Sequence, residues 1–460
     1  MTIARLLLLL ALLAMPGAAR AADEPADDPA PEPDAPAETE SADDAGNADD
    51  PEDDPEQPRP EDEYFALVGA TVHTVSGPVI PEGTILCRNG RIHAVGRDVN
   101  LPPDTEVMDV SGFHVYPGLV AVQSAGLVDG NPADGTDPFS LTMTLGLAAG
   151  ITTALTDDTA TKLTFGSLEK HVLRDDLWVD LRYDTRNPRQ RRQLREDFDR
   201  VRQYLRDLEA WEREKQTNPD AEEPDKRFLR GKYATYRRLL EGNAAALLDV
   251  GDVHSILQAC ELAEDYGIRM ILRGVHEGWT VPDRIGRANA SVIVRPRQKV
   301  GENRRVNRDT GATIQNAAIL HDHGVRVAVV PAGSLFGPGI RISLGGLAGR
   351  DLLHLPMAAA FAVRGGMSNA EAVRTITLDA ARVVGIDDRV GSIEPGKDAD
   401  FAITDGDLLH YMTHVHWTIV DGKVRYTKAE DTLFSHIRPA MEPQPEPPDD
   451  YWPRRLGEPW

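Results

Sequence analysis

The chain has 460 residues, of which 41% are hydrophobic, and a formal net charge of −24 at pH 7. This length allows more than one hydrophobic core and predicts one large and one small domain. The acidic balance argues against a nucleic-acid partner, because a phosphate backbone is bound by clustered basic side chains. The two cysteines, Cys87 and Cys260, fall in different predicted domains, so no disulfide is expected.

Residues 1–21 have the layout of a secretory signal peptide. Arg5 precedes an apolar run from Leu6 to Met15, and small residues surround Arg20. The run is short for a bilayer span, although an uncleaved anchor is the alternative. We therefore expect a secreted or periplasmic protein without stable membrane insertion.

Residues 22–63 contain nineteen acidic residues and one arginine among many prolines and alanines. Such a composition buries too little apolar surface to fold, so it predicts a disordered acidic linker. A Pro-rich C-terminal tail is expected over residues 429–460. The remaining chain is only mildly acidic.

Both ends of the folded part read as short strands joined by tight turns. Residues 64–117 contain a hairpin signal at Asn89-Gly90, and residues 393–428 contain another at Asp421-Gly422. These segments are predicted to be the first and second parts of a small β-sandwich.

Residues 118–392 alternate apolar strand-like runs, such as 291–294, with helical patterns over the length of a (β/α)8 barrel. Helices are expected over residues 255–266 and 369–384. Within them, residues 184–240 carry a narrow apolar stripe on a helix rich in both Arg and Glu. Interleaved charges of both signs indicate a solvated face. This helical insertion is expected to pack on the barrel or to pair two chains as a homo-oligomer.

Three segments together resemble the amidohydrolase superfamily. They are the Pro-Gly-Leu-Val stretch at 117–120, the Gly-Ser-Ile-Glu-Pro-Gly-Lys-Asp-Ala-Asp run at 391–400, and the strand with its Asp-Gly turn at 418–424. The resemblance is to the imidazolonepropionase-like branch, which hydrolyses carbon–nitrogen bonds other than peptides. It implies an α/β fold with a (β/α)8 TIM-like barrel and a composite β-sandwich formed by both ends of the folded chain. It also implies a metal-dependent hydrolase.

The metal-ligand positions of that family are replaced in this sequence. Gln123 and Ala125 stand where the first strand carries His-x-His, and Asp249 takes the place of the fifth-strand histidine. Gly274 falls at the sixth-strand histidine, and Ala332 falls at the aspartate that usually serves as general base. Alanine and glycine offer no side-chain donor, so the sequence predicts no metal and no other cofactor.

Two functions remain open from the sequence. The first is a catalytically degenerate barrel, a pseudoenzyme that binds a small-molecule ligand or a protein partner. The alternative is an active amidohydrolase with a displaced metal site, in which Asp249 and His276 bind a divalent ion such as zinc and Glu277 acts as general base. The metal content of the purified protein distinguishes them.

Overall fold

The computed structural model describes residues 62–123, 136–169, 171–297, 299–331 and 355–430. The predicted signal peptide, nearly all of the acidic linker and most of the C-terminal tail lie outside these residues, as do Ala125 and Ala332. Across the described ranges, no helix combines the length and the apolar character needed to cross a bilayer.

The chain alternates short strands and helices. The strands are β1 (Tyr64–His73), β2 (Val79–Arg88), β3 (Arg91–Gly96), β4 (Glu106–Asp109), β5 (His114–Pro117), β6 (Leu119–Ala121), β7 (Ile151–Thr156), β8 (Thr159–Lys162), β9 (Val172–Arg174), β10 (Trp178–Asp180), β11 (Ala245–Val250), β12 (Met270–Gly274), β13 (Ser291–Val294), β14 (Val327–Val329), β15 (Phe401–Thr404), β16 (Val415–Val420) and β17 (Lys423–Thr427). The helices are α1 (Leu141–Ala148), α2 (Pro188–Lys215), α3 (Lys232–Leu240), α4 (Val253–Tyr266), η1 (Gly278–Thr280), α5 (Pro282–Arg287), α6 (Asn316–Asp322), α7 (Leu355–Arg364), α8 (Asn369–Arg374) and α9 (Leu378–Val384).

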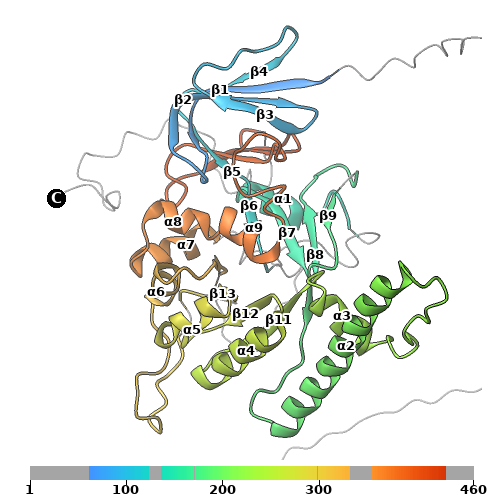
Figure 1. Cartoon of the computed structure of the whole chain (residues 1–460). Helices are drawn as coiled ribbons and strands as arrows, with labels where there is room; N and C mark the ends of the chain where they lie inside the picture. The colour runs from blue at the N-terminus through green and yellow to red at the C-terminus, as the bar shows by residue number, and fades with distance from the viewer. Residues whose placement is uncertain (1–61, 124–135, 170, 298, 332–354, 431–460) are drawn as a thin grey trace, which may run out of the picture. The chain divides into compact units, whose positions relative to one another are not determined.

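Strands from both ends of the folded part form one sheet. Its order is β17-β16-β15-β5-β1-β2-β3, with β4 paired to β1. The two chain ends meet where β15 pairs antiparallel with β5, Phe401 lying opposite Pro117 (Figure 1). The side chains between them, including Val115, Phe401 and Ile419, form a separate buried core. The composite β domain expected from the family resemblance is therefore confirmed.

The turn signals in the sequence correspond to the hairpins of this sheet. Asn89 and Gly90 join β2 to β3, and Asp421 and Gly422 join β16 to β17. All four residues have positive φ, which Asn, Asp and Gly tolerate best. Local turn chemistry therefore sets both hairpins.

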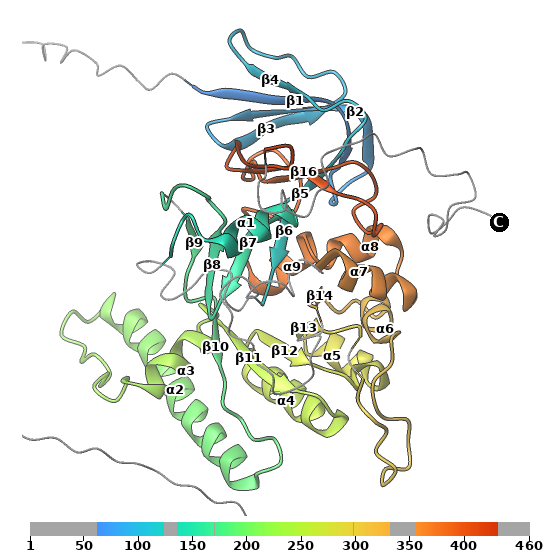
Figure 2. The ribbon, with the colours of Figure 1, turned by 180° about the vertical axis from the view of Figure 1, so that it is seen from behind.

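The second part of the fold is a TIM-like barrel built from two sheets, β6-β7-β8-β9 and β10-β11-β12-β13-β14 (Figure 2). The five strands of the second sheet are all parallel. Backbone hydrogen bonds link the sheets, from Leu177 N to Asp158 O at one junction (3.0 Å). Unlike the expected alternation of strand and helix, β8 and β9 run antiparallel to their neighbours.

The other junction explains why one predicted helix is broken. The sequence predicts a continuous helix over residues 369–384, but the structure has α8 and α9 separated by residues 375–377. There the carbonyl of Thr375 accepts from Val329 N (3.1 Å) and that of Ile376 accepts from Val120 N (2.9 Å). These two carbonyls take the place of a strand between β14 and β6, so tertiary pairing overrides the helical pattern.

Alternate residues of the barrel strands lie in two different cores. Ala245, Leu247 and Ile271 belong to an inner cluster to which α9 contributes, whereas Leu248 and Leu272 pack with the surrounding helices. Since side chains alternate along a strand, Asp249 and Arg273 continue the inner row beyond the last apolar layer. The strands therefore direct these two charged residues toward the barrel mouth.

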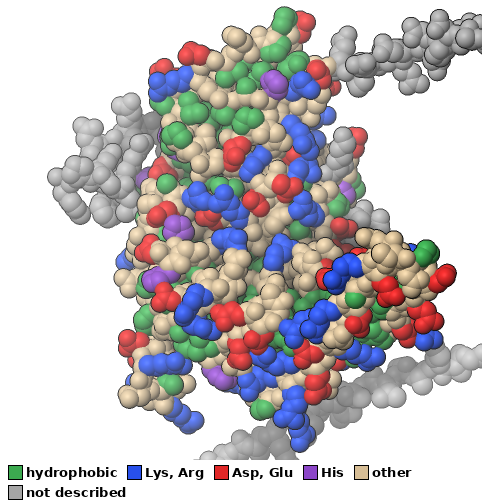
Figure 3. Space-filling model, viewed as in Figure 1, with side chains coloured by type: hydrophobic (Ala, Val, Ile, Leu, Met, Phe, Trp, Pro, Cys, Tyr) green, Lys and Arg blue, Asp and Glu red, His purple; other side chains and the backbone are tan. Residues whose placement is uncertain are grey.

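The helical insertion packs on the barrel through α4. The guanidinium of Arg195 on α2 forms ion pairs with Glu261 (3.0 Å) and Asp265, and Tyr266 donates its hydroxyl to the Arg195 carbonyl (3.1 Å). Acidic and basic side chains intermix where α2 and α3 lie, at the lower right of Figure 3. This mixture is that of an ordinary solvated helical face.

Gly118, the glycine of the Pro-Gly turn that precedes β6, is expected to tolerate no larger residue. A Cβ at this position would lie 2.0 Å from Oγ1 of Thr152, which is fully buried on β7. We expect Gly118→Ala to lower the free energy of unfolding by about 1–3 kcal/mol, measured by urea denaturation. Gly301→Ala is the control, because no atom of the described residues lies within 4 Å of its added Cβ. Equal stabilities for the two variants would contradict this packing.

Candidate functional site at the barrel mouth

The first feature of the barrel mouth is a forked ion pair between neighbouring strands. Asp249 is the last residue but one of β11 and lies in register with Arg273 of β12. Arg273 donates from Nε to Oδ1 (2.6 Å) and from Nη2 to Oδ2 (2.7 Å) of Asp249. Bidentate pairs of this kind are the strongest that arginine makes with a carboxylate. Both carboxylate oxygens are therefore already engaged by a cation.

A second arginine links the two sheets of the barrel, between the ends of β13 and β6. Arg295 follows β13, and its Nη2 donates to Oε1 of Gln123, which follows β6 (3.4 Å). Both residues stand at the carboxyl ends of parallel strands, where barrel enzymes place their sites. No carboxylate forms an ion pair with Arg295 among the residues that the structure describes. The partner that the described residues give Arg295 at the strand ends is the neutral amide of Gln123.

Glu277, the candidate general base, is a structural carboxylate. It is 6% exposed, and its two oxygens accept hydrogen bonds from Val253 N (2.9 Å) and Gly311 N (3.0 Å). These bonds join the start of α4 to the loop before α6. Its burial and its two backbone partners make Glu277 a link between these segments rather than a carboxylate presented at the open mouth.

The imidazole of His276, the other candidate ligand, packs closely against Gly251. A Cβ on Gly251 would lie 2.1 Å from Cε1 of the imidazole. Burial lowers the pKa of His276, with smaller opposing effects from Glu277 and Asp252. The ring is therefore neutral at pH 7, held by its contact with the backbone. Gly274 lies at a positive φ of 98° and has no side chain to contribute.

These residues do not fit a divalent metal ion. Asp249 is paired with Arg273, Glu277 with backbone amides, and the amide of Gln123 with Arg295. Within the described ranges, no three His, Cys, Asp or Glu side chains converge as metal ligands would. The displaced site expected as the alternative is not assembled by Asp249, His276 and Glu277. Ala125 and Ala332 lie outside the described residues, and alanine carries no donor.

Sequence reasoning missed the two arginines that dominate the mouth. The available signal is a buried apolar run that ends in an arginine: Arg273 follows the run 270–272 within β12, and Arg295 follows β13. Arginine does not belong to any metal-ligand pattern, because a guanidinium cannot coordinate a cation. Of their partners, the sequence marks Gln123 as a replaced ligand position and Asp249 as both a replaced position and a candidate ligand of a displaced metal site.

The comparisons with known proteins agree with the fold. Residues 251–430 match the model of the Amidohydrolase family. A crystal structure of an amidohydrolase from Thermotoga maritima MSB8 has a TM-score of 0.62 and 21% identity, covering 79% of this chain and 100% of that one. At that identity the likeness concerns the fold alone.

A shorter match exists to a curated protein. A 5-methylthioadenosine/S-adenosylhomocysteine deaminase from Symbiobacterium thermophilum is 35% identical over 71 residues, which is 12% of this chain and 16% of the deaminase. The chain thus aligns with a small part of that protein's length. Gln123, Ala125 and Asp249 all precede the segment that matches the family model.

Proposed function

We propose that the chain, whose residues 251–430 match the Amidohydrolase family model, is an exported amidohydrolase-type barrel that has lost metal-dependent hydrolysis and binds a ligand at its mouth. The observation that carries this proposal is the fork between Asp249 and Arg273. A guanidinium at this position engages the carboxylate and repels a divalent cation. Export rests on the signal-peptide pattern of residues 1–21.

The charge of the mouth supports an anionic ligand. Arg295 has only the neutral amide of Gln123 as its described partner at the strand ends. A guanidinium presents a planar set of donors that suits a carboxylate or a phosphate. In metal-dependent amidohydrolases the barrel mouth holds a metal-activated water. In this chain the mouth offers hydrogen-bond donors to a bound anion. The protein would therefore recognise its ligand without transforming it.

Metal analysis of the purified full chain tests the proposal. We expect substoichiometric zinc, manganese and iron, and no change in melting temperature on adding a chelator, since a resident metal would contribute to folding stability. Restoring only the first histidine pair, with Gln123→His and Ala125→His, should still leave the protein without metal.

One result would reverse the assignment. If the native chain holds about one equivalent of metal, as a hydrolase site would, and Asp249→Ala or His276→Ala removes it, the displaced-site hydrolase becomes the correct account. Gly301→Ala is a matched surface variant that should leave the metal content unchanged in either case.

A further inference from the structure

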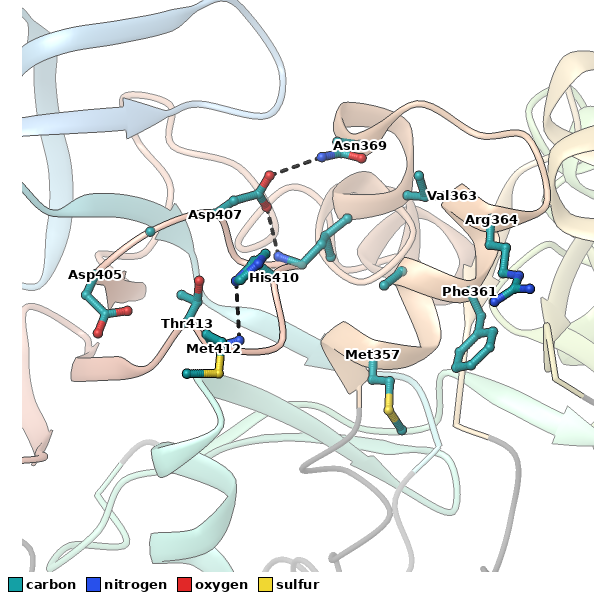
Figure 4. Close-up of a pocket in the computed structure, with 13 residues that line it drawn as sticks. Met357, Phe361, Val363, Arg364, Asn369, Asp405, Asp407, His410, Met412 and Thr413 are labelled. Carbon is teal, nitrogen blue, oxygen red and sulfur yellow. Dashed lines mark hydrogen bonds between the residues drawn. The ribbon is translucent and has the colours of Figure 1, made fainter. Parts of the chain in front are cut away.

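We propose that a second binding site lies between α7, the start of α8 and the connection from β15 to β16, and that it takes an elongated zwitterion with an apolar body, such as a short apolar peptide. A cavity of about 880 Å³ opens there, a size typical of small-molecule sites. Asp405 and Asp407 lie on one side of it, and Arg364 with Phe361 lies on the other (Figure 4). Its lining includes none of the mouth residues described above.

The acidic side of this cavity is held rigidly. Oδ2 of Asp407 accepts from Nδ2 of Asn369 (3.0 Å), and Oδ1 accepts from Leu409 N (2.9 Å). A carboxylate has about four lone-pair positions, so about two remain for a ligand. Asp407 forms no ion pair with any residue that the structure describes. It is thus a fixed and uncompensated negative charge on the cavity wall.

Two half-buried histidines whose charge would act on Asp407, His73 and His114, do not neutralise it. His73 and His114 share a hydrogen bond between Nε2 and Nδ1 (2.9 Å), and the His73 ring stacks on Tyr116 with centroids 4.1 Å apart. Burial, together with the neighbouring His114, lowers the pKa of His73 to about 4 despite the opposing charge of Asp407. Both histidines have lowered pKa values and are neutral at pH 7. The negative charge of Asp407 therefore remains available to an ammonium group.

Asp405 adds to the same side but is more fully engaged. It accepts from His414 N (2.7 Å) and hydrogen-bonds with Nε2 of His416 (3.1 Å). Burial raises the pKa of Asp405, but these hydrogen bonds outweigh burial and lower it below its ordinary value. Asp405 therefore stays ionised and strengthens the negative potential beside Asp407.

The opposite side of the cavity is basic. Arg364 lies in the last turn of α7, and no carboxylate among the described residues pairs with it. The guanidinium of Arg297 lies 4.5 Å from the ring centroid of Phe361, which also lines the cavity. This end suits a carboxylate group, because arginine binds carboxylates with directed hydrogen bonds.

Two exposed methionines lie among the lining residues. Met357 is 38% exposed and Met412 is 52% exposed. Methionine side chains adapt to apolar ligands of varied shape. A ligand with an ammonium near Asp407, a carboxylate near Arg364 and an apolar body over the methionines would satisfy all three features.

Titration calorimetry of the full chain with trileucine tests this site. We expect saturable binding at peptide concentrations up to about 1 mM. Acetylating the peptide's amino terminus or amidating its carboxyl terminus should each weaken binding about tenfold, because each removes one charge-assisted contact. Absence of saturable binding, or equal affinity for all three peptides, would overturn the proposal.

Two variants test which residue binds each end of the peptide. Arg364→Gln should weaken the binding of trileucine about tenfold and leave the binding of the amidated peptide unchanged. Asp407→Asn should weaken the binding of trileucine about tenfold and leave the binding of the acetylated peptide unchanged. Arg304→Gln, at an exposed arginine outside the cavity, is the matched control. Equal losses for free and capped peptides would contradict the assigned contacts.

The competing occupant is a second copy of the chain. If native protein sediments as a dimer and Met357→Glu or Met412→Glu converts it to monomer, the cavity is a subunit interface and the peptide proposal is wrong. Monomeric native protein, with peptide binding abolished by the same variants, supports the peptide site.

Discussion

Replacing Lys162 by methionine is expected to lower the free energy of unfolding by about 3–5 kcal/mol, the usual cost of leaving buried carboxylates without their cation. Lys162 ends β8 and is 1% exposed. Its Nζ lies 2.6 Å from Asp398 and 3.1 Å from Asp400, and it also pairs with Asp421. Methionine keeps the length of the side chain, so the loss reports the charge.

The surrounding charges explain why the effect is large. Burial alone would lower the pKa of Lys162, but Asp400, Asp421 and Asp398 outweigh burial and raise it. Arg389 binds Asp398 with distances of 2.8 and 2.7 Å, and Nε of Arg91 lies 3.9 Å from the same carboxylate. Among the described residues, Lys162 is the cation that pairs with Asp400 and Asp421, so removing it leaves these two carboxylates without an ion-pair partner.

Chemical denaturation measures this loss of unfolding free energy, and two further variants serve as its controls. Lys423→Met, at an exposed lysine of β17, should change stability by less than about 0.5 kcal/mol. Lys162→Met combined with Asp400→Asn should recover part of the loss, because one buried charge disappears with its partner. A Lys162→Met protein as stable as the native chain would show that the buried network contributes nothing.

The second large effect is a dependence of stability on pH between 6.5 and about 4, set by His73. In this range the unfolded imidazole takes up a proton that the folded one refuses, so stability falls as pH falls. A shift of this size corresponds to about 2–3 kcal/mol after allowing for partial exposure of the ring. Urea denaturation at a series of pH values measures it.

Comparing the pH dependence of stability between two variants isolates the contribution of His73. Burial raises the pKa of Asp400, so that carboxyl gains stability as pH falls and opposes His73 in the same range. His73→Phe keeps a ring on Tyr116 but removes the titration, and should flatten the pH dependence relative to the native chain. His93→Gln, at an exposed histidine of β3, should leave it unchanged. An unaltered slope in His73→Phe would assign the effect elsewhere.

The parts of the fold that follow from short-range sequence patterns could be predicted. The Asn-Gly and Asp-Gly turns form hairpins, and the apolar run at 291–294 forms β13 within the parallel sheet. The helix predicted over residues 255–266 corresponds to α4, which begins at Val253 because Asp252 caps it by accepting from Ser255 N. These features depend on neighbours within a few residues.

The site depends on partners that the sequence does not bring together. Asp249 could be recognised as a replaced ligand, but its pairing with Arg273 follows from the parallel register of β11 and β12. Lys162 meets Asp421 across 259 residues, and no local pattern marks either as a buried ion-pair partner. The same holds for Asp407 and Arg364, which line opposite sides of one cavity only after both segments have packed.

The pairing of β5 with β15 constrains the order in which a newly made chain can fold. His114 and Thr404 lie opposite each other although 290 residues separate them in sequence. At ribosomal rates this interval takes roughly 15 to 60 s to synthesise. Throughout that time β5 has an open edge, which can pair with other chains. Completion of the sheet is therefore a late event in biogenesis, and the nascent protein needs its β5 edge shielded until the last strands emerge.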